Sequence, residues 1–318
     1  GTEVPFRFFI YALEQSTGMR GALVRYWELF PELFVERTDK LGGWFAWGDI
    51  ARKPGPLCDF GLMFHESPES QEGLTHDLQL GLQPMPYIEP SMYQLHFGDF
   101  EQRPTREQII ERLTTYADPA FTGRILSSQP ARTPAQEEEK RRMCRSVQVS
   151  GLRNQQGELV INAVGQYNWV AGSKWAAQLA CVLSPNLPEG RGEWLLEHAR
   201  KNILEREGMA GAYLDSYQAH LTAVSYAPEH LQAAQIPPIF AGDPPAPCVA
   251  VAYAAMEYVD ALRQLIGEQR IILPNIYYLR APMPLHQFDV LGKEHWAAPA
   301  GWLMESLRAL GRHKVVTQ

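Results

Sequence analysis

The chain has 318 residues, of which 45% are hydrophobic and 20% charged, and its formal net charge is −7 at pH 7. This composition is typical of a folded protein with a sizeable core, and the length suits one large domain or a barrel of about 250 residues with additions. The acidic balance argues against a nucleic-acid surface, which needs clustered basic residues. No stretch reaches the roughly 18 consecutive apolar residues that a membrane span needs.

The segment from Val4 to Leu13 is rich in β-branched and aromatic residues, which predicts a strand. We expect residues 1–16 to form an N-terminal strand and to be a candidate for the end of a preceding β-domain. The chain opens on Gly1 rather than on Met, so we expect it to be a piece of a longer polypeptide. The compartment, cytoplasmic or exported, is therefore left open. We assign residues 17–318 to a barrel domain.

Beyond residue 17, short apolar runs alternate with segments of helical periodicity, which is the pattern of parallel strands joined by crossover helices. We expect helices at 19–30, 71–82, 194–207, 249–266 and 299–310. Another helix is predicted to begin at Thr105, where Gln108 completes a capping box. We expect strands at 43–47, 59–66, 84–89, 176–183, 211–215, 270–274 and 288–291, with Val315 in an eighth. The predicted fold is an α/β (β/α)8 TIM-like barrel.

Residues 120–175 interrupt this rhythm and are predicted to be an insertion above the barrel. The polar stretch 127–142 is expected to be a loop, and its runs of glutamate and then of basic residues indicate a solvated, mixed-charge surface. Two short apolar stretches, 147–149 and 159–161, flank the turn sequence 154–157. This spacing predicts a β-hairpin.

Metal and cofactor chemistry has little support in the sequence. The four cysteines, Cys58, Cys144, Cys181 and Cys248, form no CxxC pair, and the histidines show no ligand spacing. The chain has no G-x-S-x-G elbow, no P-loop, no G-x-G-x-x-G and no HExxH. We therefore expect no metal and no required cofactor.

The strongest functional candidate is Asp215, which directly follows the apolar run Gly211-Ala212-Tyr213-Leu214. A carboxylate at the end of a barrel strand faces the place where such folds carry their active sites. There it can attack an anomeric carbon or stabilise an oxocarbenium-like charge. The alternative is an aspartate that caps a helix or closes a loop.

A second carboxyl group is needed as proton donor, and we expect it in the segment after residue 287. Glu294 and Asp289 are the candidates, with Trp296 as an apolar neighbour that would help a carboxyl keep its proton. The alternative for Glu294 is a surface residue at the start of the next helix.

Other polar and aromatic residues at presumed strand ends are expected to bind a sugar substrate, because aromatic faces stack on sugar CH surfaces and carboxylates accept from hydroxyls. Taken singly, each ring is more often part of the core, and a glutamate here can instead be a buried ion-paired residue. The expected substrate-binding residues are His65, Glu66, Tyr87, Glu89, Trp44, Trp47, Tyr213, Tyr217, Asn275 and Trp296. For Glu66, a role as catalytic acid is the alternative to that of sugar-hydroxyl acceptor.

Several of these stretches resemble a group of bacterial glycoside-hydrolase-like barrels in order and spacing. The resemblance is carried by 29–47, 60–66, 169–188, 211–215 and 257–275. The Gly-x-Tyr-Leu-Asp strand also resembles the nucleophile strand of endo-α-N-acetylgalactosaminidase-like barrels. The resemblance implies that Asp215 is a nucleophile, that a later glutamate such as Glu294 is the acid/base, and that a β-sandwich precedes the barrel. It implies no particular substrate, because related barrels differ in their loops.

The sequence therefore predicts a glycoside hydrolase that acts on an oligosaccharide, polysaccharide or glycoconjugate with two carboxyl groups. Two alternatives stay open. One is a carbohydrate-binding barrel without catalysis, and the other is a structural domain of a larger cell-surface protein. The expected partner is a carbohydrate, with no nucleic acid and no membrane span.

Overall fold

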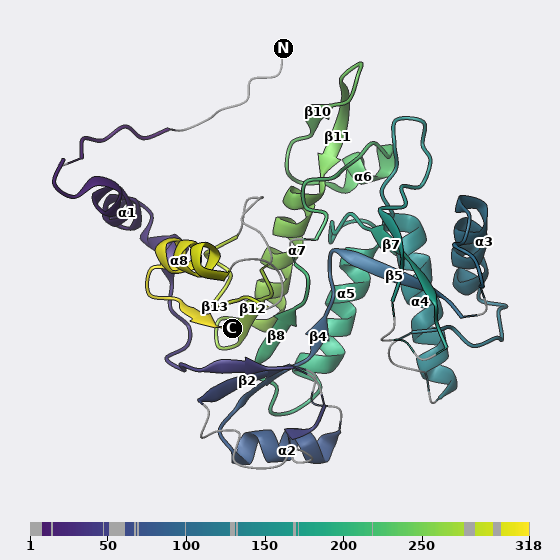
Figure 1. Ribbon diagram of the computed structural model, residues 1–318, viewed down its shortest axis with the longest axis horizontal. Helices are drawn as coiled ribbons and strands as arrows, with labels where there is room; N and C mark the ends of the chain where they lie inside the picture. The colour runs from purple at the N-terminus through teal and green to yellow at the C-terminus, as the bar shows by residue number, and fades with distance from the viewer. Residues whose placement is uncertain are drawn as a thin grey trace.

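The computed structural model shows a mixed α/β fold (Figure 1). The residues that it describes are 8–13, 15–46, 48–50, 61–66, 68, 70–98, 100–127, 131, 133–167, 170, 172–217, 219–276, 284–294 and 300–317.

Three small parallel sheets form the centre of the molecule. The first has the order β1-β2-β3, with strands Gly43–Phe45, Leu62–Glu66 and Gln83–Met85. In the second, β8 (Gly211–Leu214) lies between β4 (Tyr87–Ile88) and β12 (Ile271–Pro274). The third pairs β13 (Val290–Gly292) with β14 (Val315–Thr317). These strands match seven of the eight predicted positions, and all of them run parallel to their neighbours.

Hydrogen bonds connect the three sheets in sequence. The amide of Ala210 donates to the Pro84 carbonyl at 2.8 Å, and the amide of Asp289 donates to the Ile272 carbonyl at 3.0 Å. The Thr317 hydroxyl donates to the Gly42 carbonyl at 2.8 Å, next to β1. Within the described ranges, however, the strands are assigned to separate sheets and not to one closed barrel. The eight-stranded barrel therefore stays a prediction.

The strand predicted at 176–183 is present, but it does not belong to the parallel strands of the predicted barrel. Its residues form β7 (Trp175–Ala180), which pairs antiparallel with β5 (Met92–Phe97) and β6 (Ala163–Gln166) in a sheet of their own. Strand β7 is the central strand of that sheet, and Leu179 is fully buried. A central strand reads as a continuous apolar run whether its neighbours are parallel or antiparallel, so the sequence pattern did not separate the two.

Two other predictions in this region are corrected. The stretch expected to be a polar loop belongs largely to α4 (Pro134–Ser150), whose N-cap Thr133 accepts a hydrogen bond from the Gln136 amide. Residues 147–149 lie in this helix, so the predicted hairpin is wrong on that side. Only a tight turn remains, closed by an antiparallel bridge between Arg153 and Leu159. The charged residues of α4, 137–142 and Arg145, are partly buried, while Cys144 and Val147 are fully buried.

Most helices lie where the periodicity predicts them. The capping box of Thr105 and Gln108 is confirmed at the start of α3 (Arg106–Ala117). Helix α5 (Arg191–Ala199) continues as a π-helical turn at Arg200–Leu204. The remaining helices are α1 (Gly18–Leu29), α2 (Gln71–Gln79), α6 (Pro228–Ala233), α7 (Val251–Ile266) and α8 (Ala300–Gly311). None of the helices in the described segments is long and apolar enough to cross a membrane.

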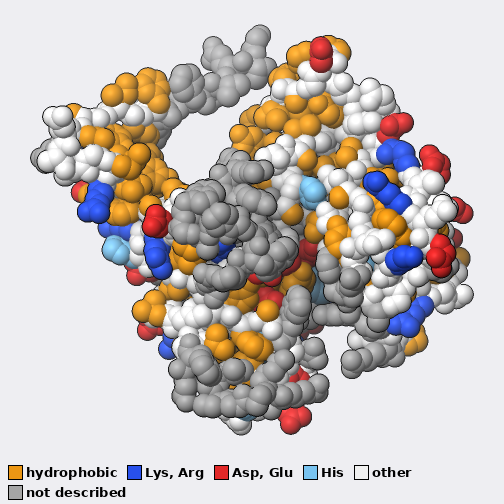
Figure 2. Space-filling view, viewed as in Figure 1, with side chains coloured by type: hydrophobic (Ala, Val, Ile, Leu, Met, Phe, Trp, Pro, Cys, Tyr) orange, Lys and Arg blue, Asp and Glu red, His pale blue; other side chains and the backbone are white. Residues whose placement is uncertain are grey.

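Helices α1 and α8 lie on the same side of the molecule (Figure 1). The indole of Trp27 in α1 donates to the Ala309 carbonyl of α8 at 3.2 Å. Residues 8–13 form no strand, and residues 1–7 lie outside the described residues. This segment and α1 expose apolar side chains, visible as an orange area in Figure 2, among them Phe8, Ile10 and Met19.

Most of the buried apolar residues that the structure describes fall into two clusters. The smaller one lies among the parallel strands and consists of Phe64, Met85, Tyr213, Ile271, Leu273, Val290 and Val315. The larger one lies between the strands and the helices and includes Leu214, Tyr258, Ile272 and Leu291. Neighbouring residues of a strand thus point to opposite clusters. The same alternation decides which residues beyond the strand ends face inward.

Candidate active site

Asp215 lies directly after β8 and is the centre of a hydrogen-bonded group. Its Oδ2 accepts from the hydroxyls of Tyr87 at 2.6 Å and Ser216 at 2.9 Å. Its Oδ1 accepts from the Tyr213 hydroxyl at 3.1 Å and from Asn275 Nδ2 at 2.9 Å. Four hydrogen-bond donors therefore converge on one carboxylate and fix its position.

The parallel register explains why these residues meet. Tyr87 of β4 is paired with Tyr213 of β8, and Leu214 of β8 is paired with Pro274 of β12. The residues that follow, Asp215 and Asn275, therefore emerge side by side at the carboxyl edge of the sheet. Parallel strands bring residues that are far apart in the sequence to one edge, as in α/β enzymes.

Glu294 joins this group from beyond the end of β13. Its Oε2 accepts from Asn275 Nδ2 at 3.0 Å, and the same nitrogen serves Asp215. Since both carboxylate oxygens bind one nitrogen, they lie at most about 6 Å apart, close to the spacing of about 5–5.5 Å between the carboxyl groups of retaining glycosidases. Glycine at position 292 lets the backbone of β13 lie close to the ring of Trp44, because a side chain there would collide with that ring.

Glu66 ends β2 and is 2% exposed. Burial, together with the negative charges of Asp215 and Glu294, raises its pKa to about 8, while hydrogen bonds with Tyr213 and Trp44 oppose this change. The ring of Trp44 lies 5.4 Å from that of Tyr213, centroid to centroid. Glu66 therefore carries its proton at neutral pH.

Glu89 follows β4 and is partly exposed. Burial and the negative charge of Asp215 raise its pKa to about 8, against the opposing charge of Arg191. The Arg191 side chain donates to the carbonyl of Glu89 at 2.9 Å, and its Cζ lies 4.8 Å from the ring centroid of Trp194. Glu89 is thus a second carboxyl group that keeps its proton at neutral pH.

Three predicted site residues lie elsewhere. Asp289 precedes β13, at the opposite end of the strand from Glu294, and is ion-paired with Arg37 and Arg263. His65 is fully buried and its Nδ1 lies 2.6 Å from Asp77 Oδ2 of α2. Tyr217 packs edge-on against Phe288, away from the strand cluster. Trp47 and Trp296, also predicted for the site, lie outside the described residues.

Two residues at the site were not predicted. Ser216 has a positive φ of 48°, and this turn brings its hydroxyl to Asp215. Arg191 is 3% exposed and supports Glu89 from α5, more than 100 positions along the chain. Ser216 could have been found as the neighbour of Asp215, whereas no sequence signal links Arg191 to Glu89. No group of three or more His, Cys, Asp or Glu that could hold a metal ion occurs among the residues that the structure describes.

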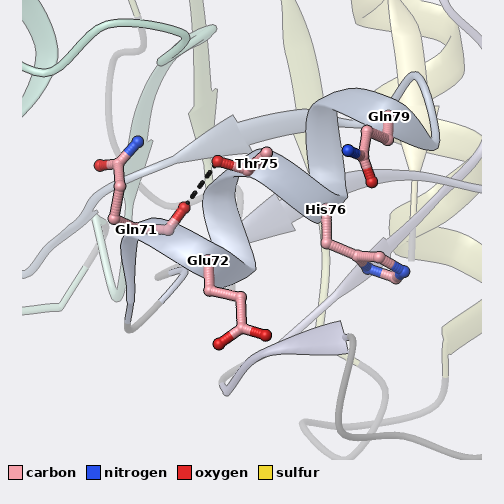
Figure 3. A pocket seen from close by; sticks show the side chains of 5 residues that line it. All are labelled: Gln71, Glu72, Thr75, His76 and Gln79. Atoms are coloured by element: carbon pink, nitrogen blue, oxygen red, sulfur yellow. Dashed lines mark hydrogen bonds between the residues drawn. The ribbon is translucent and has the colours of Figure 1, made fainter.

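A separate hollow lies on the surface of α2 and is drawn in Figure 3. It is lined by Gln71, Glu72, Thr75, His76 and Gln79. These side chains come from a single helix, and none of them belongs to the group around Asp215. The hollow is therefore a surface feature and not the site described above.

The group around Asp215 combines a carboxylate that accepts four hydrogen bonds with two carboxyl groups, Glu66 and Glu89, that keep their protons. Carboxyl groups whose surroundings give them different protonation states can divide the roles of nucleophile and proton donor. The aromatic rings of Trp44, Tyr87 and Tyr213 lie next to them, with Tyr87 and Tyr213 5.9 Å apart between centroids. This set of groups can support acid-base and nucleophilic chemistry.

No protein-family model and no curated protein sequence matches the chain. Among solved structures it is distantly similar to the glycoside hydrolase domain of PelA from Pseudomonas aeruginosa, with 12% identity and a TM-score of 0.37 over 85% of this chain and 80% of that one. It is also similar to an α-galactosidase from Thermus thermophilus, with 13% identity and a TM-score of 0.43. That match covers 93% of this chain but about half (54%) of the α-galactosidase. At such low scores and identities, neither match assigns an activity to this chain.

Proposed function

We propose that this protein hydrolyses glycosidic bonds, with Asp215 as the nucleophile and Glu294 as the acid/base, on a barrel-like arrangement of parallel strands. The main support for this proposal is the contact that both carboxyl groups make with Asn275. Asp215 and Glu294 come from separate strands and bind the same amide nitrogen of Asn275, so two carboxyl groups face each other at the carboxyl edge. Their spacing favours a retaining mechanism, in which the sugar is bound covalently to Asp215 before water releases it.

In the first step, an Asp215 oxygen would form a bond to the anomeric carbon while Glu294 gives a proton to the leaving oxygen. In the second step, Glu294 would take a proton from water, which then attacks the anomeric carbon and frees Asp215. The hydroxyls of Tyr87, Tyr213 and Ser216 donate to Asp215 and hold it in place. No cofactor takes part in this scheme.

Glu89 is the second candidate for the acid, because its raised pKa leaves it protonated at neutral pH. We favour Glu294 because its spacing from Asp215 is fixed by Asn275. Substrates with different leaving groups can distinguish the two assignments of the acid. Loss of a proton donor slows the cleavage of poor leaving groups by about 10²–10⁴-fold. It has a much smaller effect on nitrophenolate, which leaves without a proton.

The test is a panel of 4-nitrophenyl α- and β-glycosides and natural glycans, assayed with the wild type and with Asp215→Asn, Glu294→Gln and Glu89→Gln. We expect Asp215→Asn to lose at least about 10³-fold on every substrate. Glu294→Gln should lose activity on glycans but keep most of it on nitrophenyl glycosides. Glu101→Gln changes a carboxyl group that is 95% exposed and is the matched control.

Two results would contradict the proposal. The first is an Asp215→Asn variant that turns over a substrate as fast as the wild type. The second is a panel in which glycans bind and none is cleaved, which would support the carbohydrate-binding alternative. A Glu89→Gln variant with the leaving-group dependence expected of Glu294→Gln would move the acid role to Glu89.

A further inference from the structure

Four donors fill the acceptor positions of the Asp215 carboxylate. Its Oδ1 accepts from Tyr213 at 3.1 Å and from Asn275 at 2.9 Å. Its Oδ2 accepts from Tyr87 at 2.6 Å and from Ser216 at 2.9 Å. A carboxylate offers about four positions for hydrogen bonds, two on each oxygen. An oxygen with both positions taken has no lone pair left for a covalent bond, so one donor must leave before Asp215 acts as a nucleophile.

Two of the four donors are phenol groups that ring packing holds in place. The rings of Tyr87 and Tyr213 lie 5.9 Å apart between centroids, and the ring of Trp44 lies 5.4 Å from that of Tyr213. Tyr213 is 2% exposed and belongs to the smaller apolar cluster among the parallel strands. Because a phenol oxygen moves only with its ring, neither oxygen can leave Asp215 unless the packed rings move as well.

Asn275 is held by its backbone and by its side chain. Its backbone amide donates to the Leu214 carbonyl at 2.9 Å, and the next amide, that of Ile276, donates to the Gly292 carbonyl at 2.8 Å. The side chain is fully buried, and its nitrogen also donates to Glu294 at 3.0 Å. Rotation of this side-chain amide would therefore break its contacts with both carboxyl groups.

Ser216 differs from the other three donors. Its hydroxyl is carried by a single carbon, so rotation about one bond takes the oxygen away from Asp215 while the backbone stays in place. The backbone of this turn is held by the Ala219 amide, which donates to the Ser216 carbonyl at 2.8 Å. The Ser216 hydroxyl can thus leave without any change in β8 or its neighbouring strands.

We propose that Ser216 is a positioning residue that occupies Asp215 Oδ2 in the free enzyme and leaves it when substrate binds, so that Oδ2 is the attacking oxygen. Ser216 keeps its proton throughout. Oδ2 forms the bond to the anomeric carbon, while the bond from that carbon to the leaving oxygen breaks and Glu294 protonates this oxygen. Oδ1 becomes the carbonyl oxygen of the ester and keeps both of its donors. The inference rests on the proposed function, because it requires Asp215 to be the nucleophile.

The rate at which Asp215 is labelled covalently tests this role. The probes are gluco- and galacto-configured cyclitol epoxides, with labelling followed by the mass of the intact protein and located by peptide mapping. Ser216→Gly suits the φ of 48° at this position and frees one position on Oδ2 before the probe binds. We expect this variant to be labelled about 2- to 10-fold faster than the wild type, as the loss of one hydrogen bond implies. Ser216→Ala, which removes the hydroxyl without the added freedom of glycine, should also be labelled faster.

Tyr87→Phe is the matched comparison, because it also removes one donor from Oδ2. The aromatic ring stays in place, so the freed position faces this ring and not the probe. We expect its labelling to be no faster than that of the wild type. Arg312→Gly is the control for glycine itself, because Arg312 is exposed and has a φ of 57°. It should be labelled at the rate of the wild type.

Three results would overturn the inference. Labelling of Ser216→Gly and Ser216→Ala at the rate of the wild type or below would show that the serine hydroxyl does not hold back Oδ2. An equal increase in Tyr87→Phe would show that Ser216 is not distinct from the other donor on this oxygen. Both results leave the proposed function standing, since the label is still on Asp215. A wild type with no label on Asp215 would contradict the proposed function and this inference together.

Discussion

Strand β13 has an acidic residue beyond each of its ends, and the two have different surroundings. Before the strand, Asp289 is 2% exposed and forms ion pairs with Arg37 and Arg263, and it also accepts from the Ile272 amide at 2.7 Å. After the strand, Glu294 is partly exposed, and its hydrogen bond to Asn275 leads to another acid. Both residues were equal candidates in the sequence.

The difference shows which acids serve the fold. At the amino end of β13, each oxygen of Asp289 is matched by a guanidinium group, so its charge is balanced where it is buried. At the carboxyl end, Glu294 lies near Asp215 and Glu66, and within the described segments no ion pair is formed by Asp215 or Glu66. Natural proteins tolerate such unbalanced groups mainly where they perform chemistry.

The largest expected effect is at the balanced end. Asp289→Asn removes the carboxylate that pairs with the buried Arg263 and with the partly buried Arg37, which keeps Glu268 as a partner. Removal of one partner of a buried ion pair costs about 3–5 kcal/mol. The free energy of unfolding, measured by urea denaturation at pH 7, should fall by this amount. A loss below about 1 kcal/mol would show that the two ends of β13 do not differ in this way.

An intermediate effect is expected from pH. The pKa of Glu66 is raised from 4.5 to about 8, so the folded state binds a proton that the unfolded chain has lost, and stability falls as pH rises through this window. A pKa difference of 1 between the folded and unfolded states corresponds to about 1.4 kcal/mol, so the fall is on the order of a few kcal/mol. We expect the free energy of unfolding, measured by urea denaturation between pH 5 and pH 8, to fall less steeply with pH in Glu66→Gln than in the wild type. Identical slopes would mean that Glu66 titrates normally.

The smallest effect on stability is expected at Asp215. Asp215→Asn removes a partly buried negative charge, which raises the pKa of Glu66 and of Glu89, but it also weakens four hydrogen bonds, and these contributions oppose each other. We expect the free energy of unfolding to change by less than about 1 kcal/mol, compared with the large loss for Asp289→Asn. Differential scanning calorimetry of the two variants side by side provides the comparison. A severe loss for Asp215→Asn would place it among the structural acids.

Much of the fold could be predicted because local signals were strong. The capping box at Thr105 and the periodicity of α7 identified helices, and short apolar runs identified strands. Strand β7 was assigned to the wrong sheet because burial on both faces hides strand direction. Helix α4 was missed because its buried residues, such as Cys144 and Val147, follow a long charged stretch.

The site could be predicted in part. A carboxylate directly after a short buried strand, as in Asp215, indicates an edge position, and the register then brings Tyr87 and Asn275 to it. The sequence could not distinguish Asp289 from Glu294, because the arginines that bind Asp289 come from distant segments. Nor could it show that Tyr217 faces the helices, since a one-residue shift beyond a strand reverses the side that a residue faces.

The most direct test of the central claim is to trap the covalent intermediate. The protein would be incubated with a panel of cyclitol epoxides, which react with the nucleophile of retaining glycosidases, and its peptides would be mapped by mass spectrometry. Our account predicts a label on Asp215 that is absent in Asp215→Asn, with Glu101→Gln labelled as the wild type. A label on Glu66, Glu89 or Glu294 in place of Asp215 would contradict it.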